Sequence, residues 1–227
     1  MTKFMSAEEA AKLIRNGDTV ATTGFVGMGH PEELSRAIEK RFLETGEPCD
    51  LTMAWGASQN DGKSVWGLNR FAKEGLLKKV VAGHWALQPD INKMAVENKI
   101  EAYNLPQGVM MHLFRAIAGK KPGILTHVGL KTFVDPRESC GRLNSISKEE
   151  YVRLMEIDGK EYLFYKSFPV NVGIIRGTTA DELGNISIEK EPIALEFLAV
   201  ALAAKACGGK VIVQVERVTK AGCLHPM

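Results

Sequence analysis

The chain has 227 residues, of which 45% are hydrophobic and 25% charged, and its formal net charge is +2. This composition is typical of a folded globular domain, and so small a net charge gives no reason to expect a nucleic-acid or membrane partner. No window approaches 18 uncharged apolar residues, so no transmembrane helix is predicted. Glu8 and Glu9 stand where a signal peptide needs an apolar core, and we therefore expect a cytoplasmic protein.

Cysteine and histidine spacing gives no sign of a metal site. The four cysteines lie far apart, at Cys49, Cys140, Cys207 and Cys223, and no C-x-x-C pair occurs. The five histidines are equally dispersed. We predict reduced thiols and no structural zinc.

Short β-prone runs alternate with helical stripes over the first 128 residues. Ser6 and Glu9 have the spacing of a capping box. The expected helices run from Ser6 to Gly17, from Pro31 to Gly46, through Met94 and Val96, and over residues 109–117. The expected strands cover residues 18–23, 51–55, 79–82, 101–105 and 124–128. Strands that alternate with helices predict an α/β fold with a mostly parallel sheet flanked by helices.

The pattern changes after residue 133. Residues 151–157 and 160–165, joined by Asp158-Gly159, predict an antiparallel hairpin with a tight turn. A strand over 172–176, an apolar helix over 192–207 and a buried strand over 210–218 follow. We expect one domain over residues 1–227 with a hairpin insertion at about 140–166. The sequence stops directly after a strand, which we interpret as a fragment or one partner of a larger assembly.

The segment from Gly24 to Pro31 predicts a ligand site. A glycine-rich turn that follows a strand and enters a helix can present backbone N–H groups to an anion. Its spacing is G-x-x-G-x-G, whereas a dinucleotide site needs G-x-G-x-x-G. Pro31 lacks an N–H and His30 adds bulk, so a dehydrogenase is disfavoured. A tight turn without any ligand stays open as an alternative.

Pro106-Gln107-Gly108 marks a second candidate position, because it follows a strand and precedes a helix. Ligands meet parallel sheets at the carboxyl ends of their strands. The Gln107 amide could donate to a carbonyl or carboxylate, or Gln107 could be only a solvent-facing cap residue. His84 ends another strand, where a lone histidine is more often structural. No pair of general acid and base stands out among six carboxylates in charged surroundings: Glu32, Glu33, Glu149, Glu150, Glu182 and Glu189.

Several segments have distinctive sequence motifs. They are Thr22 to Pro31, Ala82-Gly83-His84-Trp85, Glu101 to Asn104 with Pro106-Gln107-Gly108, Gly129 with Thr132 to Arg137, Lys160 to Tyr165, Ala180-Asp181 with Gly184-Asn185, and Gln214 to Val218 with Leu224-His225-Pro226. In this order they resemble the N-terminal half of family I coenzyme A transferases, across essentially all 227 residues. The hairpin region is similar to the single-chain acetate/propionate subgroup rather than to two-subunit 3-oxoacid enzymes.

The resemblance implies two related α/β domains, with the nucleophilic glutamate in the second, near a glycine-rich segment. No residue of this chain matches that glutamate's motif, so we expect no catalytic nucleophile here and no activity from this chain alone. The implied reaction is CoA transfer between short-chain acids such as acetate, propionate and butyrate. Acyl-CoA and carboxylic acids are then the substrates, and no metal or redox cofactor is needed. The implied partner is a second CoA-transferase domain on the same or another chain, in a homo-oligomer.

The resemblance also implies which residues shape the acyl site. Gln107 is the candidate oxyanion donor, and Phe25, Val26 and Met28 would form an apolar wall. The full expected substrate-binding set is Gly24, Phe25, Val26, Gly27, Met28, Gly29, His30, Gln107 and Gly108. A different class, a non-catalytic ligand-sensing domain of related fold, remains as the alternative. A phosphate sensor should carry basic or hydroxyl residues in the glycine loop, and residues 24–31 offer only His30.

Overall fold

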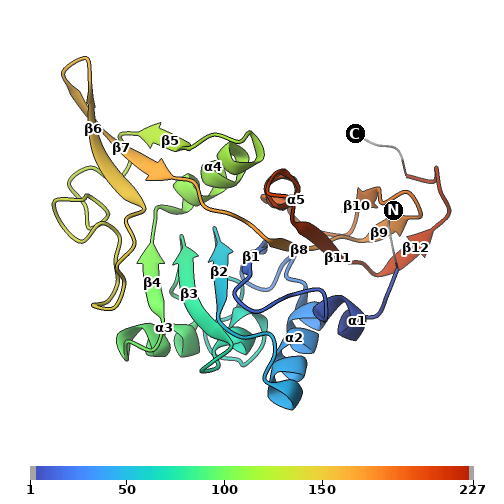
Figure 1. Ribbon diagram of the computed structural model, residues 1–227. Coiled ribbons are helices and arrows are strands. Elements are labelled where there is room, and N and C mark those ends of the chain that lie inside the picture. Colours follow the sequence, from blue (N-terminus) through green and yellow to red (C-terminus); the bar gives the residue numbers. More distant parts are fainter. Residues whose placement is uncertain (1–3, 225–227) are drawn as a thin grey trace.

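A computed structural model describes residues 4–224, and its centre is a six-stranded sheet in the order β11-β8-β1-β2-β3-β4 (Figure 1). Every neighbouring pair in this sheet is parallel, as predicted. Its strands are β1 (Thr19–Thr22), β2 (Leu51–Trp55), β3 (Leu77–Ala82), β4 (Glu101–Asn104), β8 (Val172–Arg176) and β11 (Lys210–Gln214).

Helices cover both faces of this sheet. They are α1 (Ala7–Ala11), α2 (Glu32–Thr45), α3 (Pro89–Val96), α4 (Gln107–Ala118) and α5 (Phe197–Ala206), with a 3₁₀ helix over Gly67–Phe71. Successive strand residues point to opposite faces, so Val80 packs in the core with α1, α2 and α3, whereas Val81 packs with α4 and α5. Burial on both faces explains why these strands read as continuous apolar runs rather than as alternating ones.

The helix boundaries differ from the predictions at two places. The Ser6–Glu9 capping box is confirmed, but α1 ends at Ala11 and continues only as turns toward Gly17. The helix predicted over 192–207 begins at Phe197. Leu195 has a φ of 43°, in the left-handed region, and this backbone conformation interrupts a right-handed helix.

A second sheet is antiparallel and has the order β5-β7-β6. Its strands are β5 (Gly123–Thr126), β6 (Val152–Ile157) and β7 (Lys160–Lys166). The hairpin turn is confirmed, since Asp158 and Gly159 both have positive φ. The prediction that residues 124–128 form a further strand of the parallel sheet was wrong, because β5 instead pairs with β7, a strand of the hairpin insertion, in an antiparallel arrangement. Gly123 permits this pairing, since a Cβ there would lie 2.1 Å from the Tyr165 carbonyl oxygen.

A third, small sheet has the order β10-β9-β12. Its strands are β9 (Thr179–Asp181), β10 (Ile186–Ser187) and β12 (Arg217–Thr219). The single buried strand predicted over 210–218 is therefore wrong: the chain leaves the main sheet after Gln214, and β11 is half-buried at the sheet edge. The Glu216 N–H donates to the Thr178 carbonyl (3.0 Å) and draws the chain onto β9. No helix within residues 4–224 is long and apolar enough to cross a membrane.

Candidate functional site

Buried polar side chains gather in the segments that follow the parallel strands at their carboxyl ends. Thr22 ends β1 and Thr23 follows it, and Ser58, Gln59 and Asn60 follow β2. All five are at most 1% exposed. Such an edge is where open α/β sheets bind ligands, and burial of this much polarity needs hydrogen-bond partners within the protein or from a ligand.

The glycine loop after β1 is a closed turn. The N–H groups of Phe25 and Met28 donate to each other's carbonyl oxygens at 2.9 Å, and the Val26 N–H donates to Ser58 (2.8 Å). These three donors are therefore not free for an anion, in contrast to the cradle that the sequence predicted. Phe25 and Gly27 are exposed, and Val26 and Met28 are half-buried. An apolar wall made by Phe25, Val26 and Met28 remains a prediction.

The outer two glycines of this loop allow close packing. A Cβ on Gly24 would lie 2.8 Å from Gln59 Cγ, and one on Gly29 would lie 2.8 Å from Phe197 Cζ. Both have positive φ, at 153° and 68°. Val26 also has a positive φ of 54°, which is costly for a β-branched residue. The loop is thus held tightly between the segment after β2 and the start of α5.

His30 is a buried part of this packing. Its Nδ1 lies 2.7 Å from Gln59 Oε1, and its Nε2 lies 2.9 Å from Ser35 Oγ. An amide oxygen only accepts, so in this arrangement Nδ1 carries the proton and Nε2 accepts from Ser35. Burial lowers the pKa of His30 and so favours the neutral ring. Because Gln59 Oε1 also accepts from Thr22 Oγ1 (3.1 Å), His30 links β1, the β2 loop and α2.

Gln107 is the first residue of α4 and lies over the end of β3. A Cβ on Gly83 would lie 2.4 Å from the Gly56 carbonyl oxygen and 2.7 Å from Gln107 Cα. Gln107 is half-buried, and within residues 4–224 its amide makes no hydrogen bond. The start of α4 has no side-chain cap bond, so the alternative that Gln107 caps its helix has no support in the structure.

The exposed His84 side chain is not part of this buried cluster. Its carbonyl oxygen accepts from Trp55 Nε1 and Ser58 Oγ, both at 2.9 Å, which makes its backbone a structural support. The surface carboxylates also contact neighbours in the fold: Glu32 with Arg70, Glu33 with Arg36, Glu149 with Lys79, Glu150 with Arg153, Glu189 with Arg217, and Glu182 with the Ala221 N–H. These contacts account for them without catalysis.

Sequence reasoning missed Glu196, the residue before α5. It is 2% exposed, and neither carboxylate oxygen has a hydrogen-bond partner in the part of the chain that the structure describes. Thr23 Oγ1, at the end of β1, is also buried without a partner there. Burial raises the pKa of Glu196, and the residue's own backbone N–H and the charge of Arg115 oppose this only in part. The one signal in the sequence was a single acidic residue inside the apolar run 193–204.

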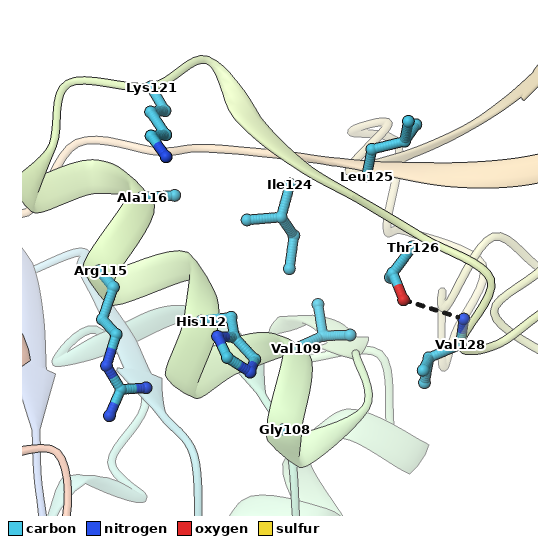
Figure 2. A pocket seen from close by; sticks show the side chains of 10 residues that line it. All are labelled: Gly108, Val109, His112, Arg115, Ala116, Lys121, Ile124, Leu125, Thr126 and Val128. Carbon is cyan, nitrogen blue, oxygen red and sulfur yellow. Dashed lines mark hydrogen bonds between the residues drawn. The ribbon is translucent and has the colours of Figure 1, made fainter. Parts of the chain in front are cut away.

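A cleft of about 580 Å³ lies between α4 and β5, beside Gly108 (Figure 2). His112 and Arg115 project from α4 in this view, and Lys121 comes from the turn that follows. Val109 and Ile124 are among the apolar residues that line the cleft, and none of its lining residues is acidic. The cleft can therefore accept a ligand with an apolar part and an anionic part. Residues 4–224 contain no cluster of three His, Cys, Asp or Glu side chains placed to hold a metal ion.

A parallel α/β sheet with buried polar groups at its carboxyl edge is typical of a ligand-binding α/β domain. The chain belongs to the Coenzyme A transferase family, whose pattern it matches over residues 4–227.

Individual relatives support the same assignment. The chain is 49% identical over 226 residues to the caffeate CoA-transferase of Acetobacterium woodii, covering all of this chain and 43% of that protein. It is 38% identical over 223 residues to the acetate CoA-transferase YdiF of Escherichia coli K12, covering 98% of this chain and 42% of that protein. The crystal structure of the YdiF acyl-CoA transferase apoenzyme from Escherichia coli O157:H7 superposes with a TM-score of 0.95 at 38% identity, over 98% of this chain and 43% of that one. The chain thus spans less than half the length of these relatives.

Proposed function

We propose that this chain is one half of a short-chain acyl-CoA:carboxylate CoA-transferase. The main support is its likeness to YdiF, at 38% identity and a TM-score of 0.95 over 98% of the chain. A related YdiF structure is described as a thioester complex with CoA. The ligand-sensing alternative lacks comparable support, because the relatives reported above are named as CoA-transferases.

The proposed reaction exchanges CoA between two acids by way of a glutamate supplied by a second domain. The glutamate carboxylate attacks the thioester carbonyl, the C–S bond breaks, and an acyl-glutamyl anhydride and CoA thiolate form. The thiolate then attacks the glutamyl carbonyl, releasing the first acid and leaving a glutamyl-CoA thioester. An incoming carboxylate reverses both steps, so the kinetics should be ping-pong. No step requires a metal or a redox cofactor.

In this proposal the present chain supplies electrostatic support and shape. Each tetrahedral intermediate carries an oxyanion, and a fixed donor aimed at it accelerates the reaction. The Gln107 amide, free of other hydrogen bonds in the described fold, is our candidate donor. The second domain is on the same or another polypeptide, in a cytoplasmic homo-oligomer. A relative 28% identical is named acetate CoA-transferase subunit alpha, which shows that a separate chain is one arrangement within the family.

The preferred acid is a short-chain carboxylate in our proposal, with an aromatic acid as the second candidate. The second candidate is favoured by 49% identity to a protein named caffeate CoA-transferase, against 38% to one named for acetate. Competition between acetate, propionate, butyrate and caffeate for CoA from one acyl-CoA donor separates the two. The proposal requires a higher kcat/KM for one of the short-chain acids than for caffeate.

We expect the 227-residue chain by itself to show no CoA exchange between propionyl-CoA and acetate. The reason is that no residue here matches the motif of the nucleophilic glutamate. The assay is run on the purified chain and on the same chain supplied with a second domain. Turnover by the chain alone at a rate near that of the two-domain protein would contradict the proposal that the second domain supplies the nucleophilic glutamate.

Lys121 should contribute to acyl-CoA binding through the phosphate groups of CoA. It lines the same cleft as Gly108, the residue after Gln107, and together with Arg115 it makes part of this cleft basic. Because Lys121 is exposed, we expect only a two- to five-fold rise in KM for acyl-CoA in Lys121→Gln, corresponding to about 0.4–1 kcal/mol. Lys120→Gln removes the same charge from the neighbouring exposed residue, which does not line this cleft. Equal KM values for acyl-CoA in both variants would show that Lys121 does not contribute to acyl-CoA binding.

A further inference from the structure

Glu196 places a carboxyl group in the interior of the described fold. Glu196 is 2% exposed and both of its oxygens lack hydrogen-bond partners within residues 4–224. A buried carboxyl group without partners is destabilising, and native structures rarely contain one without a functional reason. On the same sheet edge, Thr22, His30 and Gln59 are hydrogen-bonded to one another, whereas Thr23 Oγ1 is also buried without a partner within residues 4–224.

A series of close contacts through two glycines connects Glu196 with Gln107. Glu196 Oε1 lies 3.3 Å from the position that a Cβ on Gly56 would occupy. The Gly56 carbonyl oxygen in turn lies against Gly83, which lies against Gln107 Cα. Glu196 therefore lies against Gly56 and Gln107 lies against Gly83, and these two glycines contact each other at the carboxyl ends of β2 and β3. This is the edge where the proposed acyl-transfer chemistry takes place.

Burial, and not the charges around it, favours the neutral form of Glu196. The Glu196 backbone N–H and the positive charge of Arg115 on α4 both lower the pKa of Glu196, and burial outweighs them. His30, from the loop after β1, is buried and has a lowered pKa, so it is neutral near pH 7. The first turn of α5 contains no acidic residue, and its one basic residue, Lys205, lies in the last turn. The segment Gly56–Asn60 after β2 has no charged side chain.

We propose that Glu196 is a substrate-contacting residue that acts as a neutral carboxylic acid and donates a hydrogen bond to the acyl oxygen. This inference rests on the proposed CoA-transferase function. The O–H bond of Glu196 stays intact, so the residue forms no covalent intermediate and transfers no proton. Its hydrogen bond strengthens as the carbonyl oxygen becomes an oxyanion, which lowers the barrier rather than only improving binding.

Ionisation of Glu196 should remove this effect. A carboxylate cannot donate a hydrogen bond, and its negative charge repels both the incoming carboxylate and the oxyanion. The activity that depends on Glu196 is therefore present below its pKa and lost as the pH rises through it. Since the fold raises that pKa, this loss occurs above the ordinary glutamate range.

The test compares Glu196→Gln and Glu196→Ala in the whole enzyme, meaning this chain together with its second domain. Glutamine keeps a donor of the same shape that does not ionise. We expect it to retain kcat within about ten-fold and to lose the alkaline fall of kcat/KM, whereas alanine should lower kcat about 100- to 1,000-fold, as for other single oxyanion donors. Glu44→Gln, on the exposed face of α2, is the matched control and should keep the wild-type pH profile.

A purely structural Glu196 would give a different result. An unchanged alkaline fall in Glu196→Gln, or wild-type kcat per folded molecule in Glu196→Ala, would overturn the proposal. Thermal unfolding midpoints, measured for each variant, distinguish a loss of folded protein from a loss of catalytic rate.

Infrared spectroscopy gives a readout that does not depend on turnover. The wild-type-minus-Glu196→Gln difference spectrum near neutral pH should show the carbonyl band of a protonated carboxylic acid, and acetate should shift that band. Absence of the band would overturn the inference even in an active transferase. A band that shifts with acetate in a protein without any CoA-transferase activity would instead contradict only the proposed function.

Discussion

Replacing Gln107 with alanine in the two-domain enzyme should lower kcat about 100- to 1,000-fold, or by 2.7–4 kcal/mol of transition-state stabilisation, with little change in KM. Gln107 begins α4 at the carboxyl end of β3, and its amide is free of hydrogen bonds within residues 4–224. A donor aimed at the developing oxyanion stabilises the tetrahedral intermediate more than the thioester. The effect should therefore fall on chemistry rather than on substrate binding.

Steady-state kinetics on folded Gln107→Ala, with its thermal midpoint, test this expectation. If Gln107 only stabilised the helix, its loss would lower the midpoint and leave turnover per folded enzyme unchanged. That result would show that the site assignment is wrong. Gln107→Glu is an informative companion, because it keeps the side-chain length but replaces the amide donor with an acceptor, and it should lose as much kcat as the alanine variant.

Gly83→Ala should damage both stability and activity. The added Cβ would lie 2.4 Å from the Gly56 carbonyl oxygen and 2.7 Å from Gln107 Cα, and both obstacles are backbone atoms that cannot rotate away. Overpacking of this kind costs about 1–3 kcal/mol, which corresponds to a midpoint lower by roughly 2–12 °C for a domain of this size. Because the start of α4 must move, Gln107 is displaced, and misplacement by about 1 Å can cost about 100-fold in rate.

Gly119→Ala is the matched control for this substitution. Gly119 has a negative φ of −83°, and a Cβ there would meet its nearest atom, the Arg115 carbonyl oxygen, at 3.5 Å, an ordinary contact. Its midpoint and kcat should stay near the wild-type values. Wild-type kcat in folded Gly83→Ala would show that the Gly83–Gln107 contact does not position the site.

The candidate site could be predicted from the sequence only in part. The position of Gln107, after a strand and before a helix, was sufficient to place it at the carboxyl edge of the sheet. The glycine loop was located correctly, but three of its N–H groups are used within the protein, two in the turn itself and one by the Ser58 carbonyl. Glu196 was missed because a single acidic residue in an apolar run carries no periodic signal, and only burial without partners distinguishes it.

Local chemistry determined much of the fold from the sequence alone. The Ser6–Glu9 capping box and the Asp158-Gly159 turn depend on residues a few positions apart, and both form as predicted. The alternation of apolar strands and helical stripes likewise determined the parallel sheet, because each period reports the backbone conformation of its own segment.

Only the tertiary structure decided which segments pair over long distances. The pairing of β5 with β7 depends on Gly123 lying against Tyr165, and the division of residues 210–218 depends on Thr178 accepting from Glu216. The contact of Gly83 with Gln107 and the burial of Glu196 beside Gly56 are of the same kind. Such contacts join residues from tens of positions to more than a hundred apart, and spacing within one segment carries no information about them.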